Sequence, residues 1–126
     1  MAMDKFHDAN LAFRFVEPTD APALIANCWP ERNINQARRV IDRMQRFAEQ
    51  KRGYALVLPH ADRVIAYGQV TRWSRSAEIS DLFVSADQRG QGIGTALIRR
   101  LMSLAHDLAA DCVEIGASKR NPRAIA

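Results

Sequence analysis

The sequence predicts an α/β domain in which a mixed β-sheet carries helices on both faces, with the element order β-α-α-β-β-β-α-β. Three observations support this fold class. Two strand-like runs, 54–58 and 64–72, are joined by a turn-forming segment and predict a β-hairpin. A third run, 77–85, leads through a glycine-rich turn into an amphipathic segment at 96–108. A last run, 112–116, predicts a parallel strand, because strand, helix and strand in this order form a right-handed crossover.

The chain begins with a polar segment and a short strand. We expect residues 1–11 to be a loose lead-in, and residues 12–16, A-F-R-F-V, to form the first strand. The Glu-Pro-Thr-Asp segment that follows would end this strand. Either Thr19 or Asp20 can then cap a short helix that ends before Pro30.

The second helix is predicted over residues 34–51, where apolar residues recur at helical spacing. Gly53 follows this segment and is typical of a residue that ends a helix. Basic residues concentrate between positions 38 and 52, but Asp42 and Glu49 lie among them. We therefore interpret this charge as the solvated face of a helix, with a nucleic-acid-binding surface as the alternative.

The strand predicted over residues 77–85 has an irregular pattern. Ile79 is apolar, but so are Leu82 and Val84, which would face the opposite side of a regular strand. The phase of the pattern changes near Ser80 and Asp81, as it does at a β-bulge. The alternative is a central strand that is simply buried on both faces.

The segment between this strand and the next helix, R-G-Q-G-I-G from Arg89 to Gly94, contains three glycines in five residues. Glycines let a backbone approach a ligand closely and adopt dihedral angles closed to other residues. The N–H groups of the following helical turn favour an anion, typically a phosphate. A P-loop would require Lys-Ser/Thr after its last glycine, whereas Thr95-Ala96 follow here. A dinucleotide fingerprint would require G-x-G-x-x-G, and the spacing here is G-x-G-x-G.

The R-x-x-G-x-G pattern of Arg89, Gly92 and Gly94 resembles the pyrophosphate loop with which the GNAT acyltransferases bind acetyl-coenzyme A (acetyl-CoA). Residues 81–84, D-L-F-V, are similar to the family's fourth strand. Asn121, in N-P-R-A-I-A, is similar to the start of the family's N-x-x-A segment. The sequence thus resembles a GNAT-family acyl-CoA N-acetyltransferase, which implies a GNAT-like mixed, splayed β-sheet flanked by helices on both faces.

The resemblance also implies how acetyl-CoA is bound. In the family the strand before the loop bends away from the next parallel strand, and the pantetheine arm lies in the gap. The diphosphate meets mainly the backbone N–H groups of the loop, and Asn121 contacts the pantetheine or orders a water molecule. Asn121 also fits a helix N-cap before Pro122. The implied coenzyme-binding residues are Leu82, Phe83, Val84, Arg89, Gly90, Gln91, Gly92, Ile93, Gly94, Thr95 and Asn121.

Acetyl transfer to an amine requires a polarised thioester carbonyl and a deprotonated amine. A backbone N–H on the splayed strand, that of Leu82 or a neighbour, can polarise the carbonyl. An amine with a pKa of about 10 also requires a carboxylate, or a water molecule held by one, to take its proton. Glu78 and Asp81 are the candidate bases, and Glu78 comes first because its position resembles that of the base in several family members. The alternative for each is a solvated or substrate-positioning carboxylate.

We therefore expect an acetyl-CoA-dependent N-acyltransferase whose acceptor is a primary amine of a small molecule or a protein. The alternative is a non-catalytic coenzyme A-binding or regulatory module of the same fold. The family's C-terminal segment, with a tyrosine often proposed to protonate the leaving thiolate, has no counterpart before Ala126. We accordingly expect a domain that is truncated after residue 126. Homodimers are common among similar proteins, although no residue here indicates one.

The composition is that of one globular domain spanning residues 1–126, with 48% hydrophobic and 25% charged residues. No apolar run approaches the roughly 20 residues that span a bilayer, so no membrane association is expected. Cys28 and Cys112 lie far apart in apolar segments, which indicates small buried residues of a cytoplasmic protein. The three histidines are isolated from one another, so no metal site is expected. The net charge of +4 fits the steering of a polyanion such as coenzyme A.

Overall fold

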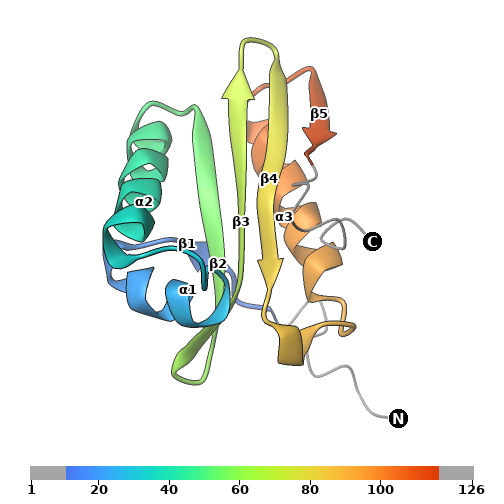
Figure 1. The fold of residues 1–126 in the computed structure, drawn as a ribbon. Coiled ribbons are helices and arrows are strands. Elements are labelled where there is room, and N and C mark those ends of the chain that lie inside the picture. Colours follow the sequence, from blue (N-terminus) through green and yellow to red (C-terminus); the bar gives the residue numbers. More distant parts are fainter. Residues whose placement is uncertain (1–10, 117–126) are drawn as a thin grey trace.

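The structure is a computed structural model that describes residues 11–116. Its strands are β1 (Arg14–Phe15), β2 (Gly53–His60), β3 (Arg63–Trp73), β4 (Ser76–Val84) and β5 (Cys112–Ile115), and its helices are α1 (Ala21–Asn27), α2 (Ile34–Glu49) and α3 (Ile93–Asp107). Two 3-10 turns, η2 (Pro18–Asp20) and η3 (Ala86–Gln88), precede α1 and α3. The strands form one sheet in the order β1-β2-β3-β4-β5. Figure 1 shows α1 and α2 on one face of this sheet and α3 on the other, which confirms the predicted fold class.

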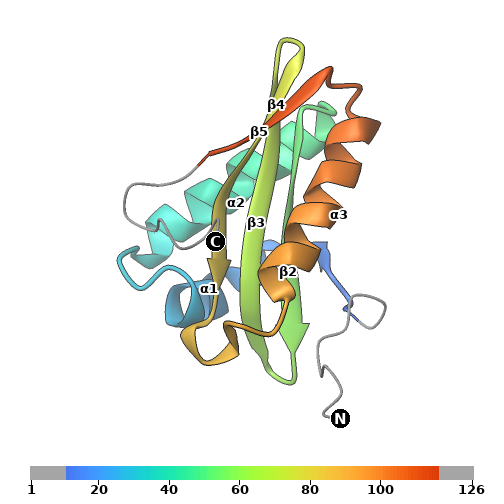
Figure 2. The ribbon, with the colours of Figure 1, turned by 90° about the vertical axis from the view of Figure 1, so that its right-hand side faces the viewer.

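The sheet is antiparallel from β1 to β4 and parallel between β4 and β5. β5 pairs with the first four residues of β4, from Ser76 to Ile79. Next to this pairing, the N–H of Gly116 donates to the carbonyl of Ile79 over 2.8 Å. Figure 2 shows β5 then directed away from β4. Within residues 11–116, the half of β4 that leads to the glycine-rich loop therefore has no paired strand on this edge.

A β-bulge interrupts β4 at the predicted position. The register between β3 and β4 shifts between Tyr67 and Gln69, so that Asp81 and Leu82 together oppose the single residue Gly68. Asp81, at the bulge, has a positive φ of 53°, which is uncommon for a residue with a Cβ. A Cβ at Gly68 would lie 2.9 Å from a methyl group of Leu82, so the bulged strand packs where only a glycine leaves room. The predicted bulge is confirmed.

The sheet separates two hydrophobic cores. On one face α3 packs its apolar side chains, among them Leu97 and Leu101, against Ile79 and Leu82 of β4. On the other face α1 and α2 pack against Tyr67 and its neighbours in β2 and β3. The first core includes Leu11, which was expected to belong to a loose lead-in. An apolar residue at that point is buried, so the packed domain begins before the first strand.

The termini of two helices differ from the prediction. α2 ends at Glu49, and the left-handed residue after it is Lys51, with φ 55°. Gly53 does not end the helix but is the first residue of β2, where a Cβ would lie 2.8 Å from the carbonyl oxygen of Val70. α3 begins at Ile93 rather than at residue 96, and its N-cap residue, Gly92, adopts the left-handed conformation.

Asp20 lies at the N-cap position of α1, as expected, but its side chain does not cap this helix. The carboxylate instead accepts two hydrogen bonds of 2.8 Å from the guanidinium of Arg14 and one of 2.8 Å from the N–H of Glu17. Burial opposes ionisation of Asp20, but these bonds outweigh it and lower the pKa of this carboxyl. Asp20 thus ties β1 to the start of α1.

Candidate functional site

The glycine-rich loop forms an open concave backbone at the N-terminus of α3. Gly90 and Gly92 have φ angles of 80° and 84°, which residues with a Cβ rarely adopt. A Cβ at either position would find no heavy atom of residues 11–116 within 4 Å. Among these residues the two glycines are therefore required by the backbone conformation and not by packing.

The backbone N–H groups from Gly90 to Thr95 donate to no acceptor among residues 11–116. The first helical bond of α3 runs from the N–H of Ala96 to the carbonyl of Gly92, which leaves the earlier amides available. No acidic side chain occupies the first turn of α3 to compensate them. This array of amides, at the positive end of a helix of 15 residues, suits an anion such as a diphosphate.

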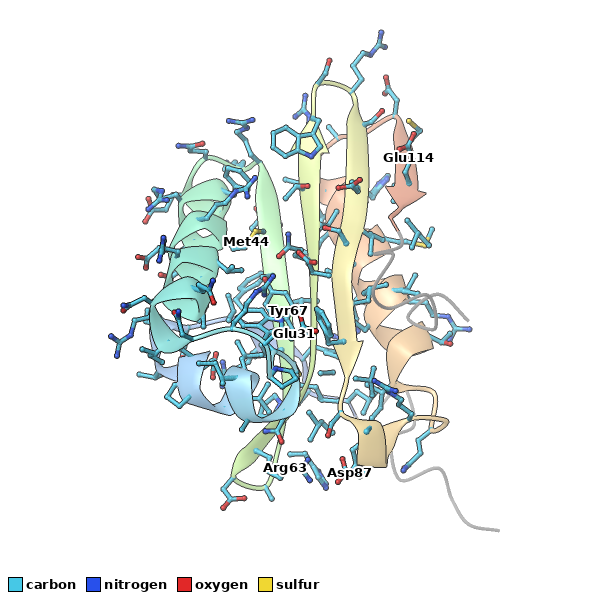
Figure 3. All side chains as sticks on the ribbon, in the orientation of Figure 1. Glu31, Met44, Arg63, Tyr67, Asp87 and Glu114 are labelled. Atoms are coloured by element: carbon cyan, nitrogen blue, oxygen red, sulfur yellow. The ribbon has the colours of Figure 1, made fainter. Side chains whose placement is uncertain are left out.

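An ion-pair network holds η3, the turn from which the loop departs. Arg63, at the start of β3, donates to both carboxylate oxygens of Asp87 over 2.9 and 3.2 Å. The same guanidinium reaches Ser85 Oγ and Asn27 Oδ1, and Ser85 donates to Asp87 over 2.6 Å. Figure 3 shows Arg63 and Asp87 side by side at the end of the sheet. The Arg63 hydrogen bond is the main cause of the lowered pKa of Asp87, and the bond from Ser85 adds to it.

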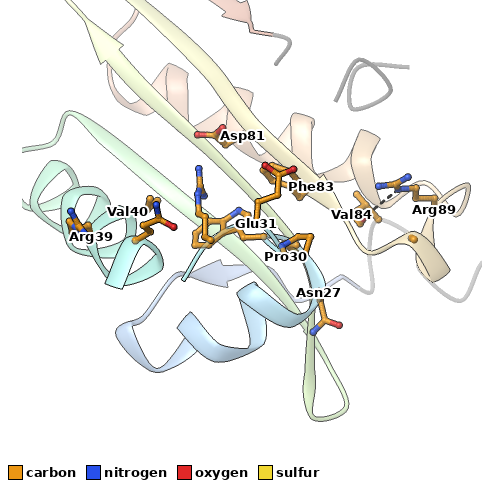
Figure 4. Close-up of a pocket in the computed structure, with 14 residues that line it drawn as sticks. Asn27, Pro30, Glu31, Arg39, Val40, Asp81, Phe83, Val84 and Arg89 are labelled. Atoms are coloured by element: carbon orange, nitrogen blue, oxygen red, sulfur yellow. Dashed lines mark hydrogen bonds between the residues drawn. The ribbon is translucent and has the colours of Figure 1, made fainter. Parts of the chain in front are cut away.

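Arg89 connects the loop to the open edge of β4. Its Nε donates to the carbonyl of Val84 over 3.2 Å, the contact drawn as a dashed line in Figure 4. The N–H of Ser85 donates to the carbonyl of Ile65 on β3. The carbonyl of Val84 belongs to the same peptide group and points in the opposite direction, away from β3. The Arg89 side chain thus lies against the edge along which the family would place the pantetheine arm.

A pocket of about 960 Å³ opens beside this edge, on the face of the sheet covered by α1 and α2. Figure 4 shows its three walls: the connection between α1 and α2, the first turns of α2, and the end of β4 with η3. Charged side chains of both signs line it, namely Glu31, Arg32, Arg39, Asp81 and Arg89. The apolar part of the wall includes Trp29, Phe83 and Val84.

The structure separates the two candidate bases. Asp81, at the bulge, lines the pocket together with Phe83 and Val84. Glu78 lies on β4 between Thr71 and Glu114 of the neighbouring strands and does not line this pocket. A Cβ placed on Gly116 would lie 3.3 Å from Glu78 Oε2, so this carboxylate lies against the end of β5.

The three predicted pantetheine-binding residues occupy different environments. Leu82 is buried in the core under α3. Phe83 packs against the core under α1 and α2, and Val84 packs against the opposite core. Successive side chains of a strand point to opposite faces of the sheet, which explains this distribution. Asn121, the remaining predicted residue, lies outside the described residues.

Neither cysteine provides a nucleophile at this site. Cys28 lines the pocket, but burial raises the pKa of its thiol to about 12, so it stays protonated near neutral pH. Cys112 was expected to be buried and is exposed, because β5 is the edge strand of the described sheet. Within residues 11–116 the structure brings no three potential metal ligands together, and no helix is long and apolar enough to cross a membrane.

The wall contributed by residues 27–32, between α1 and α2, was not predicted from the sequence. Trp29 is only 3% exposed, and its ring meets that of Tyr67 edge-on with centroids 4.7 Å apart. The guanidinium of Arg32 lies 4.5 Å from the centre of the Trp29 ring. The sequence W-P-E-R between two helices has no motif spacing. A tryptophan and an arginine in a short interhelical connection were the only available signal.

Comparisons with known proteins agree with this geometry. The model of the acetyltransferase (GNAT) family matches residues 19–126. A search of curated proteins finds no match to this chain. The crystal structure of a ribosomal-protein-alanine N-acetyltransferase from Brucella melitensis is similar with a TM-score of 0.75 and 20% identity, over 91% of this chain and 79% of that one.

Two further solved structures share the fold. One is glucosamine-6-phosphate N-acetyltransferase from Arabidopsis thaliana, with a TM-score of 0.70 and 16% identity over 89% of this chain and 85% of that one. The other is a predicted acetyltransferase with acetyl-CoA from Clostridium acetobutylicum, with a TM-score of 0.68 and 16% identity over 90% and 85% of the two chains. At these identities the likeness concerns the fold.

Proposed function

The chain belongs to the GNAT acetyltransferase family, and we propose that it transfers an acetyl group from acetyl-CoA to a primary amine of a small molecule or a protein. The observation that supports this most is the array of N–H groups from Gly90 to Thr95, which have no acceptor among residues 11–116, beside the half of β4 that β5 does not pair with. A diphosphate and an extended arm attached to it require these two features next to each other.

The described residues fit coenzyme A. The amides of Gly90 to Thr95 would receive the diphosphate. Within residues 82–84, the backbone groups that point away from β3 would pair with the pantetheine arm. Arg89 now donates to the carbonyl of Val84, on that same edge. We propose that the coenzyme takes this carbonyl and that Arg89 turns towards the diphosphate. Asn121 stays a proposed contact of the pantetheine.

The acetyl thioester supplies an activated acyl group, and the residues of the pocket would prepare the amine. An amine with a free pKa of about 10 must lose a proton before it attacks. Asp81 lines the pocket and is the better placed base, directly or through a water molecule. Glu78 is the second candidate, placed at the β4–β5 pairing. A backbone N–H of the bulged segment would stabilise the oxyanion.

We also propose a cytoplasmic location. Both cysteines of the chain are free, as is usual in a reducing compartment.

Calorimetric titration with acetyl-CoA, followed by thiol-release assays over a panel of amines, tests the proposed function. We expect saturable one-site binding and release of free coenzyme A that depends on the added amine. Binding without turnover on any amine would instead support the non-catalytic coenzyme A-binding module. Absence of binding would contradict both functions.

A further inference from the structure

Two hydrogen-bond donors in the pocket wall have no acceptor in the described part of the chain. Nη1 of Arg32 and Nε1 of Trp29 are both buried, and neither donates to an acceptor among residues 11–116. Both residues line the pocket. Burying such donors unpaired costs about 1–3 kcal/mol each, and more when the group is charged. An acceptor group of a ligand would remove this cost.

Arg32 and Asp81 line the pocket with opposite charges. Neither Arg32 nor Asp81 forms an ion pair with a described residue. Arg39, on the first turns of α2, adds a second positive charge to the pocket from the wall next to that of Arg32. Its only described hydrogen bond goes from Nε to the carbonyl of Asn35 in its own helix, over 3.4 Å.

The opposite charges of Arg32 and Asp81 act on one buried group. Tyr67 is fully buried, and the pKa of its phenol is raised, first by burial and then by the charge of Asp81, while Arg32 acts in the opposite direction. The guanidinium of Arg32 lies over the Trp29 ring, which meets the Tyr67 ring edge-on, and Asp81 lines the same pocket from β4. A ligand in this part of the pocket would meet the negative charge of Asp81 and the positive charge of Arg32 together.

We propose that the acceptor is a primary amine that also carries an anionic group, a carboxylate or a phosphate, bound by Arg32. This inference rests on the proposed function, since it places the amine next to Asp81 on the bulged strand. The planar guanidinium, held against Trp29, presents its N–H groups in a fixed plane, the geometry that binds carboxylate or phosphate through two bonds.

Matched pairs of amines test the proposal: propylamine against β-alanine, and ethanolamine against O-phosphoethanolamine. For the wild type we expect kcat/KM to be higher for an anionic member by about 10- to 100-fold, the factor that a hydrogen bond to a charged group contributes. The two pairs separate carboxylate from phosphate. Equal kcat/KM values within both pairs would overturn the proposal.

Variants of Arg32 show whether this residue is responsible. Arg32→Gln should bring the ratio within a pair close to one, and Arg32→Lys should leave an intermediate ratio, while KM for acetyl-CoA stays unchanged. Arg38→Gln, which removes the same charge from an exposed position on α2 outside the pocket, should keep the wild-type ratio. A preference for the anionic amine that persists in Arg32→Gln would contradict the assignment of the anionic subsite to Arg32.

A binding measurement separates this proposal from the proposed function. O-phosphoethanolamine, ethanolamine, β-alanine and propylamine are titrated into the wild type and Arg32→Gln, both saturated with coenzyme A. Binding of an anionic amine that is lost in Arg32→Gln would support the anionic subsite even if no amine is acetylated. Failure of both anionic amines to bind more tightly than their neutral partners would reject it, even if acetyl transfer occurs.

Discussion

At the scale of single residues, Asp81 combines an unusual backbone with a charge in the pocket. Its positive φ of 53° belongs to the bulge, and the carboxylate lines the pocket beside the half of β4 that β5 does not pair with. Asparagine adopts this conformation as readily as aspartate and keeps the shape of the side chain. Asp81→Asn therefore removes the charge with the least disturbance of the strand.

We predict that Asp81→Asn lowers kcat by about 10²- to 10⁴-fold, the usual contribution of a general base, and leaves KM for acetyl-CoA unchanged. The loss should be smaller at high pH, where more of the free amine is already deprotonated. Steady-state kinetics from pH 6 to 10 measure both effects. Glu78→Gln is the matched variant, and a large loss there with none in Asp81→Asn would assign the base to Glu78.

Gly92 provides a second test at the residue scale. Alanine there must adopt a φ of 84°, which costs a residue with a Cβ about 1–2 kcal/mol. We predict that Gly92→Ala lowers the free energy of unfolding by this amount and also weakens acetyl-CoA binding, because the amides shift. Gly94→Ala is the control for stability, since that residue is helical and its Cβ would make an ordinary contact of 3.9 Å with Val84. Equal stability of the two variants would contradict this explanation.

At the scale of elements, the position of the glycine loop depends on η3, which the Arg63–Asp87 pair ties to β3. Arg63 also contacts Asn27 at the end of α1, so one guanidinium joins a strand, a helix and the turn before the loop. A Cβ at Gly90 or Gly92 would meet no heavy atom of the described residues within 4 Å, so side-chain packing does not position the loop there. We therefore expect its position to depend on the element that precedes it.

The lowered pKa of Asp87 gives a prediction with a definite sign. A carboxyl whose folded pKa is depressed stabilises the fold above its unfolded pKa of about 4, and this stabilisation is lost as the pH falls towards the folded pKa. We therefore predict that Asp87→Asn is less stable than the wild type at pH 7 and binds acetyl-CoA more weakly. The difference in stability should shrink below about pH 4.

Urea unfolding between pH 2.5 and 7 measures the stability difference. Asp111→Asn is the control, because its partner Arg75 is 84% exposed at the side chain and such pairs contribute little. A stability difference for Asp87→Asn that does not change with pH would show that the pair does not act through its charge.

At the scale of the whole molecule, local patterns predicted the order of elements because alternation, helical spacing and glycine turns act within a few residues. The bulge was predictable for the same reason, from the phase change before Leu82. Helix ends were less predictable. Gly53 resembles a residue that ends a helix, but the sheet requires it for its close approach to Val70.

The site was predictable only in part, because its two halves depend on different information. The amides around Gly92 lie within one local motif, so the sequence indicated them. The pocket wall at Trp29 and Arg32 lies next to Asp81 only after α1 and α2 have packed on the sheet. No spacing in the sequence encodes that proximity. For the same reason the sequence placed Glu78 before Asp81, although Asp81 is the one that lines the pocket.

The central claim is that the backbone amides from Gly90 to Thr95 bind the diphosphate of coenzyme A. Two-dimensional ¹H–¹⁵N NMR of the labelled protein tests it most directly, by titration with coenzyme A and with pantetheine, which lacks the diphosphate. We predict that the amide resonances of Gly90, Gly92 and Gly94 shift strongly at saturating coenzyme A and little with pantetheine. Resonances that stay in place with coenzyme A, or shift equally with pantetheine, would contradict the claim.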